Sequence, residues 1–255
     1  LWFQKLCFSY VFATLLPSLI SYFCIGLFTF AWASKTLNAL PALAVSILLM
    51  LTNSAMILPR LSTPDGVSNL ILLFCLFNIY FNKNKYLTCG LLLLSIGFRL
   101  DNLVSVLVIL TGMKFLPAAS ARSRINFVEY FGLAALAIGT AYLMNHFLVS
   151  DEYWFKNVTY TKTWKEYGMQ ALLYFRVFTA SYFMGLIIFL AIVHFYFPFR
   201  WKELPGYMLL LMAAVVIARF VLFPSLEERF MTAYYIAGTL LIAERFSSRA
   251  KLATS

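Results

Sequence analysis

The chain has 255 residues, of which 62% are apolar, 18% aromatic and 12% charged, and its mean hydropathy is +0.84. A soluble globular domain carries about 45–50% apolar and about 25% charged residues, so these few charges cannot cover a water-exposed surface of this size. The composition therefore excludes a soluble enzyme, a disordered chain, a coiled coil and a disulfide scaffold. It predicts an all-α fold, a polytopic transmembrane helical bundle.

The net charge of +10 comes from 20 basic and 10 acidic residues. In a membrane protein such an excess is typical of cytoplasmic loops, whereas nucleic-acid recognition needs a soluble basic face; we expect no nucleic-acid partner. The four cysteines form no CxxC pair, and His146 and His194 lie in different apolar segments. We therefore predict no metal site from Cys or His.

Nine apolar segments follow one another along the chain. A helix needs about 20 residues to cross a bilayer, and we place the segments at Cys7–Trp32, Leu40–Leu58, Val67–Phe81, Leu87–Phe98, Leu103–Leu116, Ile125–Val149, Met169–Phe197, Pro205–Phe223 and Phe230–Ala243. The fourth and fifth are too short to cross alone. Because irregular backbone cannot face lipid, we expect the charged turn between them, Arg99-Leu100-Asp101-Asn102, to lie inside the protein or under a water-filled cavity.

The basic residues indicate the orientation of these segments. Alternate loops and the C-terminal tail hold Lys35, Lys83, Lys85, Lys114, Arg122, Arg124, Arg200, Lys202, Arg245, Arg249 and Lys251. By the positive-inside rule that side is cytoplasmic. The opposite side holds most of the acids, namely Asp65, Asp101, Asp151, Glu152, Glu166, Glu227 and Glu228, and the long polar and aromatic loop 150–168. We expect the chemistry on this outer side.

The first segment then begins outside. An inner-membrane protein would need one more span before Leu1, and the chain opens without a Met. We therefore interpret residues 1–255 as a single transmembrane domain that lacks an expected first span and first outer loop.

Polar clusters on the outer side are the candidate sites. Asp65, in the turn Pro59–Gly66, could simply cap the helix that begins beside it. Arg99 and Asp101 could form a structural ion pair or mark a site, since ionisable groups at membrane depth are costly. The turn Pro224–Phe230 contains Glu227, Glu228 and Arg229, which could bind a cation or a phosphate, or form a charged interfacial turn.

The clusters together resemble motifs of the GT-C glycosyltransferases, polytopic enzymes that use polyprenyl-phosphate sugars. Ser62-Thr63-Pro64-Asp65-Gly66 resembles the outer turn that precedes a mid-chain span. Gly97-Phe98-Arg99-Leu100-Asp101-Asn102 resembles a short helix that ends in an Arg-Pro-Asp-Gly-like turn, with Leu100 in place of Pro and Asn102 in place of Gly.

Two later segments extend the resemblance to most of the chain, about Pro59 to Ile242. Asn157-Val158-Thr159-Tyr160-Thr161-Lys162-Thr163 is similar to the Pro-Asn-Thr-Tyr-x-x-Lys-type loop of bacterial arabinofuranosyltransferase-like members, with Lys156 in place of the Pro. Glu227-Glu228-Arg229-Phe230-Met231 resembles a Gly-Asp-x-x-x-x-Arg-Phe-like segment without its glycines.

The resemblance implies transfer of a sugar from a polyprenyl-phosphate donor to the hydroxyl of a glycan or lipid acceptor, in assembly of the cell envelope. It implies an integral protein of a bacterial inner membrane, with its active face toward the periplasm. It also implies a catalytic carboxylate upstream of Leu1, so no catalytic residue is assigned within the chain.

Cations would stabilise the leaving phosphate. We expect Arg229 and Lys162 in this role, followed by Arg99, with Asp101 orienting Arg99 and Glu228 positioning Arg229 or a divalent cation. No metal-binding residue is assigned with certainty. Asn157 and Tyr160 would belong to the substrate loop.

Two other functional classes stay open. A transporter or flippase of lipid-linked saccharides would share the hydrophobicity and the outer aromatic loop, but it should show a polar path to the inner leaflet. A non-catalytic membrane subunit would explain the departures from the motifs.

Overall fold

The computed structural model describes residues 10–60, 63–81, 84–115, 124–148 and 228–253, together with isolated residues at 166, 168, 169, 172, 208, 211, 214, 215 and 218. Regular structure in this part of the chain is helical throughout, as the composition predicts. The chain divides into two compact units, Leu1–Phe77 with Glu228–Ser255, and Asn78–Glu227. We call them unit 1 and unit 2.

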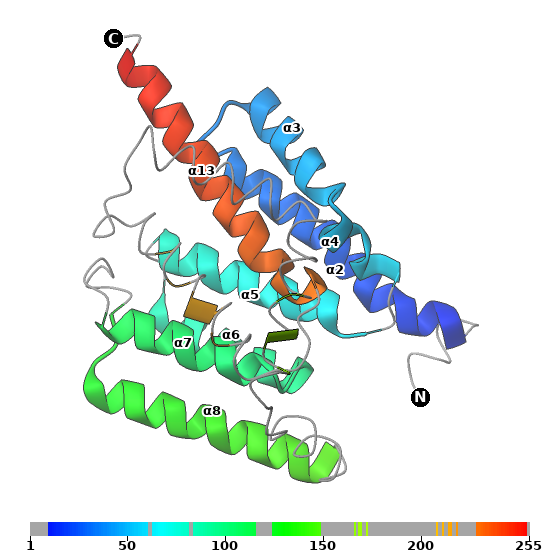
Figure 1. Cartoon of the computed structure of the whole chain (residues 1–255), viewed down its shortest axis with the longest axis vertical. Coiled ribbons are helices and arrows are strands. Elements are labelled where there is room, and N and C mark those ends of the chain that lie inside the picture. Colours follow the sequence, from blue (N-terminus) through cyan, green and yellow to red (C-terminus); the bar gives the residue numbers. More distant parts are fainter. Residues whose placement is uncertain are drawn as a thin grey trace. The chain divides into compact units, whose positions relative to one another are not determined.

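Unit 1 joins the N-terminal helices to the C-terminal helix (Figure 1). Its described elements are α2 (Tyr10–Ala33), α3 (Ala39–Met50), α4 (Asn53–Met56), η1 (Leu58–Arg60), most of α5 (Asp65–Tyr80), η2 (Glu228–Met231) and α13 (Thr232–Ala253).

Helices α2 and α5 pack side by side and run in the same direction. Near their starts, a Cβ on Gly66 would lie 3.4 Å from the Cα of Ser18. Further along, the Phe28 ring lies 5.2 Å from that of Phe74 and 4.9 Å from that of Phe77. Glycine at position 66 therefore allows the two backbones to approach where α5 begins.

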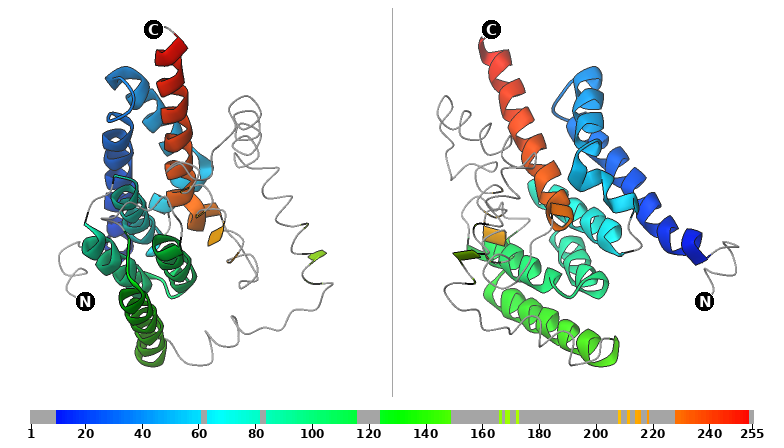
Figure 2. Two further views of the ribbon diagram at one scale, coloured as in Figure 1. Left: turned by 90° about the vertical axis from the view of Figure 1, so that its left-hand side faces the viewer. Right: turned by 45° about the vertical axis from the view of Figure 1, so that its right-hand side comes forward.

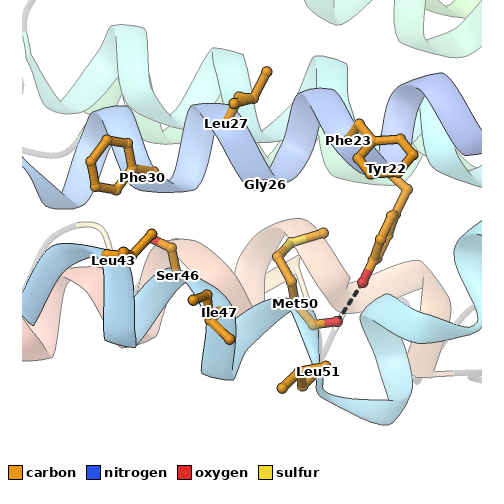
Figure 3. Close-up of a pocket in the computed structure, with 10 residues that line it drawn as sticks. All are labelled: Tyr22, Phe23, Gly26, Leu27, Phe30, Leu43, Ser46, Ile47, Met50 and Leu51. Carbon is orange, nitrogen blue, oxygen red and sulfur yellow. Dashed lines mark hydrogen bonds between the residues drawn. The ribbon is translucent and has the colours of Figure 1, made fainter. Parts of the chain in front are cut away.

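Helix α3 runs antiparallel to α2. The Tyr22 hydroxyl donates to the main-chain carbonyl of Met50 at 2.9 Å, whereas Phe30 and Leu43 face each other toward the other end of α3 (Figure 3). The two helices leave a groove of about 360 Å³ whose lining is almost wholly apolar.

Unit 2 contains α6 (Lys85–Phe98), α7 (Asn102–Phe115) and α8 (Phe127–Leu148), which lie side by side (Figures 1 and 2). Lys85 pairs with Glu129 at 2.7 Å, and the Phe115 ring lies 6.0 Å from that of Phe127. Helices α6 and α8 therefore begin at the end where α7 finishes, and α7 is antiparallel to both.

Most predicted segments that fall in the described residues coincide with a helix to within a few residues, but Leu40–Leu58 is wrong as a single helix. Helix α3 ends at Met50, and the Thr52 hydroxyl donates to the carbonyl of Leu49 at 2.7 Å. Two short helical turns, α4 and η1, follow in place of a continuous helix. Three consecutive polar residues, Thr52, Asn53 and Ser54, lie at this break within an otherwise apolar run, and they were the available signal of it.

The last predicted segment, Phe230–Ala243, also differs from the structure. Helix α13 begins at Thr232 and continues to Ala253, through Arg245 and Arg249. Hydropathy indicates where a helix leaves lipid, but it does not indicate where the backbone hydrogen bonds of that helix end. The prediction therefore missed the charged C-terminal part of α13, which continues after Ala243. The predicted segments Met169–Phe197 and Pro205–Phe223, and the loop 150–168, fall almost wholly outside the described residues.

Within the described residues, two helical stretches are long and apolar enough to cross a membrane, Leu15–Ala33 and Phe127–Met144. The first is only 28% buried and the second only 11%. The apolar helices α3, α5, α6 and α7 have 12, 16, 14 and 14 residues, fewer than the about 20 of a full crossing.

Candidate functional site

Asp65 lies at the start of α5 in unit 1 and is buried, with 3% of its surface exposed. Its Oδ2 accepts a hydrogen bond from the Thr63 hydroxyl at 2.6 Å and lies 3.4 Å from Nη1 of Arg229. A buried carboxylate is stable only when it is paired and hydrogen-bonded, and these two contacts meet that need. Asp65 therefore does more than begin the helix, because it binds the guanidinium of a residue distant in sequence.

Asn69 lies one turn after Asp65, on the same face of α5, and joins this helix to the start of α13. Its Nδ2 donates to the carbonyl oxygens of Asp65, at 2.9 Å, and Arg229, at 2.8 Å. Its Oδ1 accepts from the main-chain N–H of Ala233 at 3.0 Å. The amide side chain therefore supplies an acceptor to one of the first N–H groups of α13, which have no partner within their own helix.

Arg229 belongs to η2, the turn that leads into α13, and its side chain is 19% exposed. The Thr232 hydroxyl donates to the Arg229 carbonyl at 3.1 Å, so this carbonyl accepts from both Thr232 and Asn69. Main chain and guanidinium are thus held separately, by Asn69 and by Asp65. We call Thr63, Asp65, Asn69 and Arg229 the Asp65 cluster.

A second ion pair occupies the turn between α6 and α7 in unit 2. Arg99 donates from Nε to Oδ1 of Asp101 at 2.9 Å and from Nη2 to Oδ2 at 3.0 Å. The two side chains are 17% and 15% exposed. Two parallel hydrogen bonds of this kind fix the plane of the guanidinium, so Asp101 orients Arg99, as the sequence predicts.

Asn102 stabilises the turn that carries this pair. It is buried, its N–H donates to the Arg99 carbonyl at 3.0 Å, and its Nδ2 donates to the Ser95 carbonyl at 3.0 Å. The Arg99 N–H donates to the same Ser95 carbonyl at 3.1 Å. An asparagine where the resembled motif has glycine therefore has a structural role here, because its side chain bonds the last turn of α6.

The predicted site residues fall into three groups. The structure gives side-chain partners to Arg229, Arg99 and Asp101. It places the backbone of Glu228 in η2, next to Arg229. Asn157, Tyr160 and Lys162 lie outside the described residues.

Sequence reasoning identified Asp65 only as a possible helix cap and assigned no individual role to the other two members, Thr63 and Asn69. Asp65 and Asn69 are four residues apart, a spacing that places both on one face of a helix, and this spacing was the available signal. It does not name their partner, which follows 160 residues after Asn69. The sequence offers Glu228 as the carboxylate for Arg229, and the structure adds Asp65 as its ion-pair partner.

Two arginines among the described residues are arranged in a way that suits an anion. No group of three or more His, Cys, Asp or Glu side chains within them is arranged to hold a metal ion. Arg99 and Arg229 are both partly exposed and both held by a carboxylate, and a guanidinium held in this way presents a planar set of N–H donors that suits phosphate oxygens. Compared with protein-family models, curated proteins and solved structures, the chain matches none of them.

Proposed function

We propose that the chain is a polytopic membrane protein that binds a polyprenyl-phosphate sugar and transfers the sugar to a glycan or lipid acceptor on the non-cytoplasmic face. The membrane would be a bacterial inner membrane, with this face toward the periplasm. The observation that carries the proposal is the anchored position of Arg229, whose guanidinium is held by Asp65 and whose main chain is held by Asn69. The GT-C resemblance places a substrate-binding segment at the same point of the chain.

Exposed apolar side chains support the membrane setting. Val128, Phe131 and Tyr142 on α8 are 83%, 65% and 61% exposed, and Phe23 and Leu27 on α2 are also largely exposed. Soluble monomers rarely expose contiguous apolar patches beyond a few hundred Å². Contact with lipid tails would remove this apolar surface from water. It would do the same for the exposed apolar side chains of the shorter helices, such as Leu40 on α3 and Leu94 on α6.

Helix directions support the proposed alternation of inner and outer loops. In unit 1, α2 and α5 are parallel and α3 is antiparallel to α2; in unit 2, α7 is antiparallel to α6 and α8. The loop charges require the same alternation within each unit. Under this topology the Asp65 cluster and the Arg99–Asp101 pair are both assigned to the outer side.

The chemistry assigned to the arginines is stabilisation of charge on the leaving phosphate. As the bond to the anomeric carbon breaks, negative charge grows on the phosphate oxygens, and preorganised cations lower the barrier. Arg229 and Arg99 are the described candidates. Asp65 is too buried to deprotonate an acceptor, so we assign it the positioning of Arg229 and leave the catalytic carboxylate unassigned.

Binding of the donor can be tested before any transfer is sought. We would purify the full chain in detergent and measure the rise in its melting temperature with polyprenyl phosphate, using the uncharged polyprenol as the paired probe. Polyprenyl phosphate should stabilise the chain and polyprenol should not. Because a hydrogen bond to a charged group contributes about 1.5–3 kcal/mol, Arg229→Gln should weaken binding about 10- to 100-fold.

The matched control is Arg60→Gln, which removes an exposed arginine from η1 in the same unit. It should bind polyprenyl phosphate as the unmodified chain does. Equal affinity of the Arg229→Gln and unmodified chains, or equal stabilisation by polyprenol, would exclude Arg229 from the phosphate site.

Transfer itself is measured in membranes of cells that express the intact gene, with radiolabelled polyprenyl-phosphate sugars as donors. Arg229→Ala should abolish transfer while leaving the amount of inserted protein unchanged. Movement of the labelled lipid across the bilayer without transfer would instead favour the transporter class. Binding without either activity would favour a non-catalytic subunit.

A further inference from the structure

One end of unit 2 concentrates exposed aromatic rings. At this end α6 and α8 begin and α7 finishes, and the exposed rings are Tyr86, Phe115, Phe127 and Phe131. The Phe127 ring lies 6.0 Å from that of Phe115 and 6.5 Å from that of Phe131. Aromatic side chains gather in this way at the boundary between lipid tails and headgroups. We call this the aromatic end.

The aromatic end is also basic. Lys114, in the last turn of α7, places its Nζ 3.7 Å from the centroid of the Phe127 ring. The exposed Arg124 lies three residues before Phe127, just ahead of α8. Lys85 and Glu129 neutralise each other through two hydrogen bonds, of 2.7 and 3.0 Å. Among the described residues of this end, Lys114 and Arg124 therefore supply the net positive charge.

An apolar groove of about 450 Å³ runs along α7 to the same end. Its lining is Leu107, Val108, Thr111, Gly112 and Phe115 of α7, with Leu211 and Ala214. Thr111 is the polar residue in this set, and its hydroxyl is engaged by the Leu107 carbonyl at 2.7 Å and the Tyr130 hydroxyl at 3.2 Å. The groove therefore offers apolar surface to an occupant, and Phe115 connects it to the aromatic end.

We propose that the aromatic end binds an anionic phospholipid, with the headgroup phosphate at Lys114 and Arg124 and an acyl chain in the groove along α7. Each basic residue near a membrane surface adds to the attraction of anionic lipid. The apolar groove favours a phospholipid over a free phosphate ion, because only the lipid has an acyl chain to fill it. A neutral apolar helix from a second copy would leave the two cations unused. The inference requires the membrane setting proposed above but neither the donor site nor the transfer reaction.

The test uses the full chain in detergent, with phosphatidylglycerol and phosphatidylcholine of identical acyl chains as probes and bound lipid counted by native mass spectrometry. Phosphatidylglycerol should bind more tightly than phosphatidylcholine. Lys114→Gln and Arg124→Gln should each weaken phosphatidylglycerol binding about fivefold. Inorganic phosphate should not compete, because it lacks the acyl chain.

Two matched controls separate this site from general loss of charge or shape. Lys35→Gln removes a lysine that lies over the Phe77 ring at 4.8 Å, in unit 1, and it should leave lipid binding unchanged. Val108→Phe fills the groove and should weaken binding of both lipids. Ile138→Phe also adds a ring, at a position 53% exposed in the middle of α8, and should have no effect.

Equal binding of the two lipids, or equal losses in Lys114→Gln and Lys35→Gln, would overturn the headgroup assignment. Dimers that disappear in Val108→Phe while lipid binding is unchanged would assign the groove to a second copy instead. Loss of polyprenyl-phosphate binding in Arg229→Gln with intact phosphatidylglycerol binding would separate this site from the proposed donor site.

Discussion

The side-chain amide of Asn69 donates to the main-chain carbonyl of Arg229 at 2.8 Å, across 160 residues of sequence. The same amide accepts from the N–H of Ala233. One side chain on α5 therefore positions both the residue that we assign to phosphate binding and the helix that follows it. Because Asp65 holds the guanidinium of Arg229 separately, backbone and side chain can be tested one at a time.

Replacing Asn69 by leucine should destabilise the chain by about 2–3 kcal/mol. Leucine has a similar size but leaves the Arg229 carbonyl and the Ala233 N–H with one partner fewer, and buried groups that lose a partner cost about 1–3 kcal/mol. The free energy of unfolding in a denaturing-detergent titration measures the effect. The comparison is Asn84→Ala, which removes an exposed cap of α6 and should cost about 1 kcal/mol; an equal cost for both would argue against the buried role.

The Asp65–Arg229 pair should show strong coupling in a double-mutant cycle. Asp65→Asn leaves the partly exposed Arg229 guanidinium beside a neutral amide, and we expect a loss of about 2 kcal/mol, below the range of about 3–5 kcal/mol for a fully buried pair. The double variant Asp65→Asn/Arg229→Gln should be destabilised by less than the sum of the two single changes. Strict additivity would mean that the contact at 3.4 Å contributes nothing to stability.

Gly66→Ala should lower the melting temperature although alanine is the better helix former. A Cβ at this position would lie 3.2 Å from Cβ of Ser21 and 3.3 Å from the carbonyl oxygen of Ser18, so α2 and α5 would have to separate. Gly132→Ala, on α8, meets no atom within 4 Å and should raise stability by up to about 1 kcal/mol. Opposite signs for the two changes are the expected result, and a gain in both would show that the helices can move apart without cost.

The Lys85–Glu129 pair should contribute modestly to the free energy of unfolding, and this contribution should not depend on pH near neutrality. The hydrogen bond that Lys85 donates to the Glu129 carboxylate raises the pKa of Lys85 above its ordinary value of 10.5. The stabilisation from Lys85 is therefore fully present below that value and is lost only as the pH rises through the raised pKa. Lys85→Gln should lower the free energy of unfolding by about 0.2–1 kcal/mol. This loss should be the same at about pH 7 and about pH 9, because both values lie below the pH at which lysine titrates. A cost that falls across this range would contradict the raised pKa.

The sequence by itself determined the helical class and the positions of most described helices. Helices α5, α6, α7 and α8 begin and end within two residues of the predicted segments, because an apolar run is a local property that is readable without knowing its neighbours. The Arg99–Asp101 contact is local in the same sense, since its partners are two residues apart and one turn brings them together.

Tertiary structure alone decided which charges distant in sequence meet. The sequence presents Asp65 as a helix start and Glu228 as the nearest carboxylate to Arg229. Only the packing of η2 and α13 against the N-terminal helices of unit 1 places Arg229 beside Asp65. Pairing of distant side chains depends on how whole helices pack, which hydropathy along the chain does not encode.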